Sequence, residues 1–234
     1  MLYQHLSSHY DIVFPLQEKT LAFLESHLPM GRILDLACGT GTYALALASK
    51  GYLMEASDLS EDMIAYAIKK SRQSKHDITF HVQDMRDLDS TSTYDGIYII
   101  GNSLVHVESL SQAKALIKHM YQALLPSGIL IIQILNYTKI LKELPPTLPG
   151  IVVGDLHFSR IYRYIPPYIE FETSLSSPDI QSSERMKLWP ITHEQLIHLL
   201  TDEHFCDIVC FDGFSKAPFQ VEQSFQFVIK AKKG

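Results

Sequence analysis

The stretch Ile33-Leu34-Asp35-Leu36-Ala37-Cys38-Gly39-Thr40-Gly41 predicts more of the fold than any other part of this chain. It has the pattern of an apolar strand that contains one carboxylate and runs directly into a glycine turn. The Ala/Leu-rich segment 41–50 predicts a helix after the turn. Glycine is expected at Gly39 and Gly41 because there the backbone must take a positive φ or approach a ligand closely. A buried Asp35 needs partners, which loop N–H groups or the amino group of a ligand can supply.

An aspartate inside the strand, followed by Gly-x-Gly, resembles motif I of the class I S-adenosylmethionine (SAM) dependent methyltransferases. The same glycines, with Ala44 after them, also satisfy G-x-G-x-x-G/A, so an NAD-dependent oxidoreductase is an alternative. An acidic residue about 20 positions further on fits both interpretations, because both cofactors carry ribose hydroxyls. Asp35 within an apolar strand and the later segments of the chain favour the methyltransferase.

Composition and charge exclude several classes of protein. The 234 residues suit one α/β domain with an addition, and the net charge of -6 gives no basic surface for nucleic acid. No apolar run reaches the ~20 residues of a membrane span, and the polar N-terminus is unlike a signal peptide. Three cysteines are expected to be reduced thiols without a metal site. We therefore expect a cytoplasmic protein that binds neither nucleic acid nor a membrane. The resemblance implies a small-molecule substrate, and we expect a monomer or homodimer.

Strand and helix patterns alternate along most of the chain, which predicts a mostly parallel sheet covered on both faces. The resemblance implies a Rossmann-like, doubly wound α/β fold with seven strands in the order 3-2-1-4-5-7-6, the last strand antiparallel. The expected strands are 32–38, 53–58, 78–84, 94–101, 129–135, 207–211 and 224–231, and the expected helices are 41–50, one that Ser60 caps, one from Ser109 or Ser111 to Leu125, and 192–205.

Residues 137–190 interrupt this alternation. They hold seven of the eleven prolines and contain strand patterns at 157–165, 168–175 and 184–189. We expect an antiparallel β insertion after strand five, placed as a substrate lid. Residues 1–136 and 191–234 would then form the SAM-binding methyltransferase domain.

Polar residues end the first four predicted strands, where ligands of open α/β sheets bind. The resemblance implies that Asp58 accepts bonds from the ribose hydroxyls, with Leu59 against the adenine. It implies that Asp84 and the N–H of Met85 hold the adenine. The alternative is that these carboxylates only cap helices or face solvent. The cofactor-binding residues expected on this basis are Tyr10, Asp35, Ala37, Cys38, Gly39, Gly41, Asp58, Leu59, Met63, Asp84, Met85, Asn102 and Ser103.

The run Gly101-Asn102-Ser103 resembles the end of strand four in small-molecule N-methyltransferases of the glycine type. Asn102 and His106 are the expected catalytic residues, since the imidazole can accept a proton near neutral pH. A purely structural role for His106 stays open. Tyr10, within a segment resembling the methyltransferase N-terminus, would close over the methionine end of SAM or pack with Phe14 in a helix.

Together these features predict a SAM-dependent methyltransferase that moves a methyl group by SN2 displacement to a nitrogen or oxygen atom of a small molecule. Such a displacement depends on alignment more than on acid–base help. A non-catalytic SAM-fold binding or regulatory protein is the nearest alternative. The aromatic residues Tyr162, Tyr164, Tyr168 and Trp189 either cage a cationic substrate or pack in a core.

Overall fold

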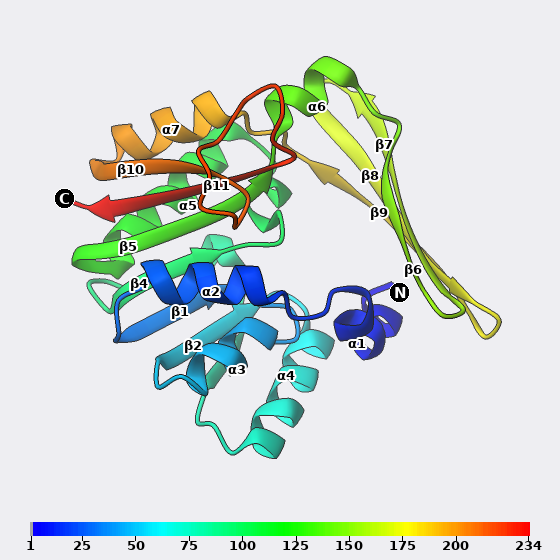
Figure 1. Ribbon diagram of the computed structural model, residues 1–234, viewed down its shortest axis with the longest axis horizontal. Helices are drawn as coiled ribbons and strands as arrows, with labels where there is room; N and C mark the ends of the chain where they lie inside the picture. Colours follow the sequence, from blue (N-terminus) through cyan, green and yellow to red (C-terminus); the bar gives the residue numbers. More distant parts are fainter. Residues whose placement is uncertain (1) are drawn as a thin grey trace.

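The computed structural model describes residues 2–234, with side chains from residue 7 onward. A seven-stranded sheet lies between two layers of helices (Figure 1). Its order is β3-β2-β1-β4-β5-β11-β10, and β11 is antiparallel to both of its neighbours. This confirms the predicted order 3-2-1-4-5-7-6. The strands are β1 Arg32–Leu36, β2 Leu53–Asp58, β3 Thr79–Val82, β4 Tyr94–Ile99, β5 Leu124–Leu135, β10 Phe205–Asp212 and β11 Gln226–Lys233.

The helices cover both faces of this sheet and begin at the predicted caps. Ser60 accepts a hydrogen bond from the N–H of Met63, and Thr192 forms a complete capping box with Gln195. One face carries three helices: α2 (Glu18–His27), α3 (Thr42–Ala48) and α4 (Glu61–Ser74). The other face carries α5 (Leu110–Ala123) and α7 (His193–Asp202) (Figure 1). Helix α1 (Leu2–Val13) lies beyond the carboxyl ends of the parallel strands.

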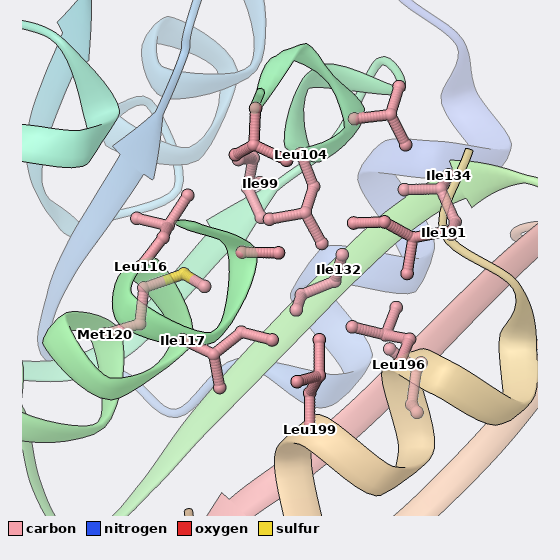
Figure 2. Packing of buried hydrophobic residues seen from close by; sticks show 14 of the residues in the cluster. Ile99, Leu104, Leu116, Ile117, Met120, Ile132, Ile134, Ile191, Leu196 and Leu199 are labelled. Carbon is pink, nitrogen blue, oxygen red and sulfur yellow. The ribbon is translucent and has the colours of Figure 1, made fainter. Parts of the chain in front are cut away.

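Strand β5 is buried on both faces, as its continuous apolar sequence predicts. Ile131 packs in the cluster formed with α2 and α3. Its neighbour Ile132 points to the opposite face, toward α5 and α7 (Figure 2). Both side chains are fully buried, and each contributes roughly 1.5–3 kcal/mol to stability by leaving water. The buried cluster on this face also contains Leu116, Ile117, Met120, Leu196 and Leu199, which Figure 2 shows.

Several predicted boundaries are wrong. Strand β3 ends at Val82 rather than residue 84, β4 ends at Ile99 rather than residue 101, and α7 ends at Asp202 rather than residue 205, where β10 already begins. The helix before β5 stops at Ala123 rather than Leu125, because Leu124 already pairs with Tyr94 of β4. Strand β5 therefore runs through Pro126-Ser127-Gly128. The pairing of β4 with β5 shifts register there, because Tyr94 pairs with Leu124 and Gly96 pairs with Ile129, so the turn-like residues lie between these two pairs. Strand β1 ends at Leu36 instead of residue 38, because Ala37 takes the left-handed conformation with φ 63°.

The segment 137–190 forms a second, four-stranded antiparallel sheet in the order β6-β7-β8-β9. It stands beside α1 at the carboxyl ends of the central strands (Figure 1). Helix α6 and strand β6 were not expected. Strand β6 contains Pro149-Gly150, which is typical of a turn, and its pairing with β7 shifts register at that point. The elements are α6 Tyr137–Glu143, β6 Thr147–Val153, β7 Leu156–Ile165, β8 Tyr168–Ser177 and β9 Ile180–Leu188.

Across the described residues, we find no helix with both the length and the apolar character that crossing a membrane requires.

Candidate functional site

A cavity of about 950 Å³ lies where the carboxyl ends of the parallel strands meet α1 and the four-stranded sheet. Most of the residues expected to bind a cofactor or to act in catalysis line it, although they come from separate parts of the chain. This grouping follows from the parallel sheet, whose strand ends meet at one edge. The expected residues that line the cavity are Tyr10, Asp35, Ala37, Cys38, Gly39, Asp58, Leu59, Asp84, Met85, Asn102, Ser103 and His106.

The glycine turn after β1 brings the backbone to the cavity wall. Gly39 has φ 56°, and a Cβ placed on it would lie 3.3 Å from the ring of Tyr10. The Tyr10 ring of α1 thus covers the turn from above. Tyr10 also packs on Phe14 with the ring centroids 5.0 Å apart in a tilted arrangement, and it lines the cavity; closure over the methionine end of SAM stays a prediction.

Gly41 and Met63 do not line the cavity. A Cβ on Gly41 would lie 2.8 Å from the ring of Phe80 and 3.1 Å from Ala67, so packing within the protein requires this glycine. Met63 is 2% exposed and packs in a core cluster with Val13. The structure therefore gives both residues a packing role, and the expected contact of each with the cofactor stays a prediction.

Asp58 ties the end of β2 to the glycine turn. Its Oδ2 accepts a hydrogen bond of 2.8 Å from the N–H of Gly39, and its Oδ1 accepts one of 2.9 Å from the N–H of Ser60. Burial raises the pKa of the Asp58 carboxyl, and these backbone N–H groups oppose that effect. Each carboxylate oxygen keeps acceptor capacity toward the cavity after these bonds are made.

Asp35 is a buried acid whose pKa is raised. Its side chain is 2% exposed, and burial raises its pKa to about 7. The phenol of Tyr98 lowers the pKa, while the nearby negative charge of Asp58 raises it. A cationic group bound in the cavity would stabilise the ionised carboxylate and lower this pKa.

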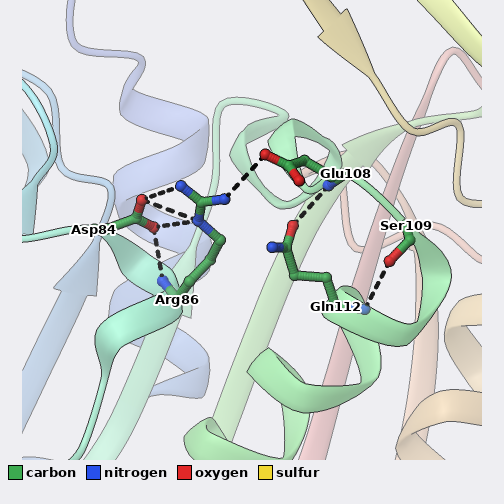
Figure 3. Close-up of polar contacts among 5 residues, drawn as sticks. All are labelled: Asp84, Arg86, Glu108, Ser109 and Gln112. Carbon is green, nitrogen blue, oxygen red and sulfur yellow. Dashed lines mark hydrogen bonds and ion pairs between the residues drawn. The ribbon is translucent and has the colours of Figure 1, made fainter.

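Arg86, which sequence reasoning did not single out, holds Asp84 in place (Figure 3). The Arg86 backbone N–H and guanidinium donate to both carboxylate oxygens at 2.5–2.9 Å, and the guanidinium also reaches Glu108 at 3.5 Å. These bonds lower the pKa of Asp84, so its carboxyl is ionised at neutral pH. Arg86 takes most of the acceptor capacity of Asp84, so the predicted bond to an adenine amino group would have to share it.

Asn102 has its side chain engaged at both ends. Its Nδ2 donates to the phenol of Tyr137 at 2.9 Å, and its Oδ1 accepts from the N–H of Leu135 at 2.9 Å. The backbone N–H groups of Gly101 and Asn102 donate to Gln133 Oε1. These bonds use one hydrogen of Nδ2 and one lone pair of Oδ1, so a contact between Asn102 and a methionine moiety, through its amide or its backbone carbonyl, stays a prediction. Asn102 also fixes the loop, in the left-handed conformation with φ 68°.

His106 faces the cavity from the short helix that follows Asn102. His106 is itself exposed toward the open cavity, and desolvation by the surrounding cavity walls lowers the pKa of its imidazole. The ring is consequently neutral at pH 7 and able to accept a proton. The geometry is consistent with the proton-accepting role expected for this residue.

Asp11 joins α1 to the glycine turn. Its Oδ1 accepts hydrogen bonds from the hydroxyls of Thr40 at 2.5 Å and Thr42 at 2.8 Å. Burial would raise the pKa of Asp11, but its hydrogen bonds outweigh that effect and lower it. Asp11 directly follows Tyr10, so this contact sets where the Tyr10 ring lies over Gly39.

The four-stranded sheet supplies cavity residues that no sequence motif had marked. Of the aromatic residues considered as a cage, only Tyr162 is among those that line the cavity. Tyr164 donates instead to the carbonyl of Pro145, and Tyr168 packs under Lys187. The sheet residues that line the cavity are Leu148, Ile151, Phe158, Arg160, Tyr162, Phe171, Thr173, Glu184 and Met186.

Comparisons with known proteins agree with this geometry. Residues 33–128 match the family model described as a methyltransferase domain. The chain is 35% identical to YqeM of Bacillus subtilis (strain 168) over 150 residues, which cover 62% of this chain and 60% of YqeM. It is also 35% identical to a glycine/sarcosine N-methyltransferase of Halorhodospira halochloris over 114 residues, which cover 48% of this chain and 42% of that enzyme. The chain thus spans less than two thirds of the length of these curated relatives.

Among solved structures, the fold is similar to that of an S-adenosylmethionine-dependent methyltransferase from Clostridium acetobutylicum ATCC 824. The TM-score is 0.84 at 21% sequence identity, and the match covers 100% of both chains. It therefore extends over the four-stranded sheet as well as the central one. At this identity the likeness establishes the fold.

Proposed function

We propose that this chain is a class I SAM-dependent methyltransferase, and that it transfers a methyl group from SAM to a nitrogen or oxygen atom of a small molecule; the matching methyltransferase domain, the curated relatives and the shared fold support this. SAM supplies an electrophilic methyl group on a positively charged sulfur. The protein has to bind this cofactor, align an acceptor with the methyl carbon and keep water away.

The residues of the cavity fit the chemical groups of SAM. The buried Asp35, with a pKa of about 7, suits a neighbouring positive charge, and SAM carries an amino group and a sulfonium. Asp58 has acceptor capacity toward the cavity for two ribose hydroxyls. Leu59 is 68% exposed on the cavity wall, where a bound adenine would remove it from water.

One observation carries the proposal: Asp35, Gly39 and Asp58 form a single unit. Gly39 turns the chain away from β1 with a positive φ and donates its N–H to Asp58, so two acidic side chains and the backbone of the turn line the same cavity. Carboxylates placed in this way suit a ligand that combines a cationic end with a ribose.

The protein's own groups support transfer to a neutral nucleophile. His106 stands in the cavity with its pKa lowered, so it can take a proton from an incoming amine or hydroxyl. The similarity to a glycine/sarcosine N-methyltransferase favours nitrogen as the acceptor atom. We further propose that the insertion 137–190 acts as the wall that holds the acceptor, since its sheet lines the cavity opposite the glycine turn.

Calorimetric titration tests the proposal directly. SAM and S-adenosylhomocysteine should bind, and NAD should not. Asp58→Ala should lower the affinity for S-adenosylhomocysteine at least about tenfold, because charge-assisted bonds of ~1.5–3 kcal/mol are lost. Asp89→Ala, which removes an exposed carboxylate outside the cavity, is the matched control and should bind normally. Binding of NAD without SAM would make the protein a nicotinamide-binding one instead.

A further inference from the structure

The four-stranded sheet turns one face to the cavity, and the middle row of that face is polar. Arg160 of β7 pairs directly with Thr173 of β8, and Thr173 pairs with Glu184 of β9. The three side chains therefore stand side by side on one face, and all three line the cavity. The rows on either side are mainly apolar and contain Phe158 and Leu175 on one side and Tyr162, Phe171 and Met186 on the other.

Each member of this row buries a polar atom that finds no hydrogen-bond partner among the described residues. The atoms are Nε of Arg160, Oγ1 of Thr173 and Oε2 of Glu184. The Arg160 guanidinium does donate to the carbonyl of Pro149 through its NH2 group. Thr173 is 4% exposed, so bulk water does not reach it freely. Leaving such atoms unpaired is costly, and it is most costly for charged groups.

The outer face of the same sheet is built in the opposite way. There Arg163 donates to Glu170 at 2.9 Å and to Glu172 at 2.7 Å, and Arg185 donates to Glu172 at 2.8 Å. Charges are thus paired on the exposed face, where pairing contributes little, and left open on the cavity face, where pairing matters most. Among residues 7–234, neither Arg160 nor Glu184 takes part in an ion pair. The cavity face therefore has the properties of a surface that a polar ligand completes.

We propose that Arg160, Thr173 and Glu184 bind the methyl acceptor, and that this acceptor is a small zwitterion with a carboxylate and an amine. The proposal rests on the proposed function, since the acceptor must share the cavity with SAM. The open Nε of Arg160 donates to the carboxylate of the ligand, and Glu184 accepts from its amine. The hydroxyl of Thr173, between them, can serve either group.

The charge and size of the cavity support this choice of ligand. Arg160 and Glu184 contribute one positive and one negative charge, so a zwitterion leaves the row neutral, whereas a phosphate dianion would leave negative charge uncompensated in a buried place. A pocket for one drug-sized ligand has a volume of about 300–1,000 Å³. The cavity of about 950 Å³ is at the upper end of that range, which leaves room for a small acceptor beside the cofactor.

Strand spacing suggests which zwitterions to use as probes. Neighbouring strands lie roughly 4.8 Å apart, so the backbones that carry Arg160 and Glu184 are separated by about 10 Å. Their long side chains can serve charges at several separations, so the probes are glycine, γ-aminobutyrate and 6-aminohexanoate. Butyrate and butylamine carry one charge each and serve as comparison ligands.

The experiment is calorimetric titration of these probes into the protein saturated with S-adenosylhomocysteine. At least one zwitterion should bind about tenfold or more tightly than both butyrate and butylamine. Arg160→Gln and Glu184→Gln should each remove that advantage, and Thr173→Val should reduce it. Arg163→Gln and Glu172→Gln on the outer face are matched controls and should leave it unchanged.

The outcomes separate this proposal from the proposed function. If the protein binds S-adenosylhomocysteine but no zwitterion binds better than the single-charge ligands, the acceptor proposal is overturned and the methyltransferase assignment stands. If the protein binds neither SAM nor S-adenosylhomocysteine, the proposed function itself fails. An equal loss of zwitterion binding in the outer-face variants also overturns the acceptor proposal. Should a Gln variant misfold by circular dichroism, Arg160→Lys and Glu184→Asp test the same geometry with the charge retained.

Discussion

The carboxylate of Asp11 in α1 lies 2.6 Å from the ammonium of Lys70 in α4. The same ammonium donates to the hydroxyls of Thr40 and Thr42, so one lysine holds both the N-terminal helix and the start of α3. This ion pair is partly exposed, and by itself it stabilises the fold only modestly. Its consequence is geometric, because it keeps α1 and Tyr10 over the glycine turn.

The first prediction follows from this contact. Lys70→Met should weaken binding of S-adenosylhomocysteine several-fold, because α1 loses the group that seats it on α4. The unfolding free energy should fall by less than ~1 kcal/mol. Lys69→Met removes the exposed neighbouring charge and is the matched control. Calorimetry and urea unfolding measure the two effects, and equal affinity in both variants would show that the contact does not shape the site.

The second prediction separates the two glycines of the turn. Gly41→Ala should lower the unfolding free energy by about 1–3 kcal/mol, because a Cβ would lie 2.8 Å from Phe80 at a positive φ. Gly39→Ala places its Cβ against Tyr10 and the cavity, so cofactor affinity should fall more than stability does. Urea unfolding measures the loss of unfolding free energy in each variant, and calorimetry measures the loss of affinity for S-adenosylhomocysteine. A loss of affinity without a loss of stability in Gly41→Ala would contradict the packing role.

The third prediction uses the pKa of Asp35, which is about 7 in the folded protein against 3.8 for the ordinary side chain. Between these values the folded state keeps a proton that the unfolded chain releases, so this group lowers stability as pH rises toward 7. Asp35→Asn does not titrate. The ligand-free variant should therefore exceed the wild type in unfolding free energy by up to ~4 kcal/mol at pH 8, and by roughly half of that at pH 5.5.

Urea unfolding at the two pH values checks this prediction. A difference between variant and wild type that does not change with pH would show that Asp35 does not titrate in this range. The variant should also bind SAM more weakly, since it lacks the negative charge that a cationic group of the cofactor requires.

The fourth prediction concerns His106. His106→Ala should lower turnover by up to ~100-fold if the acceptor needs a general base, and should leave the affinity for S-adenosylhomocysteine unchanged. Because desolvation by the cavity walls lowers the pKa of the imidazole below 6.5, wild-type turnover should fall only at pH values below that. Steady-state rates between pH 5 and 8 provide the measurement. Unchanged turnover in the variant would leave His106 with a structural role.

Much of the central fold follows from the sequence because its signals are local. The apolar run of β5 requires burial on both faces, Ser60 and Thr192 start helices through their own hydroxyls, and the glycine turn after β1 fixes a strand-to-helix reversal. The strand order and the edge at which the candidate site lies then follow from the topology of parallel sheets.

The tertiary structure alone decided what each polar side chain contacts. Nothing local in the sequence indicates that Arg86 occupies the carboxylate of Asp84, or that Tyr137 and Leu135 engage both ends of Asn102. Some of these partners are distant in sequence, and others are near but depend on the direction in which a side chain points. A sequence motif specifies neither the distant partner nor the direction of the side chain.

The same distinction applies to the insertion. Its alternating sequence predicts strands, but both faces carry charged residues, so periodicity does not reveal which face meets the cavity. Only the pairing of β7, β8 and β9 brings Arg160, Thr173 and Glu184 into one row. The sequence by itself determined a SAM-type fold with its glycine turn. The strand register within the second sheet, together with its position at the cavity, decided which charges are buried without partners, because burial depends on contacts between segments far apart in the chain.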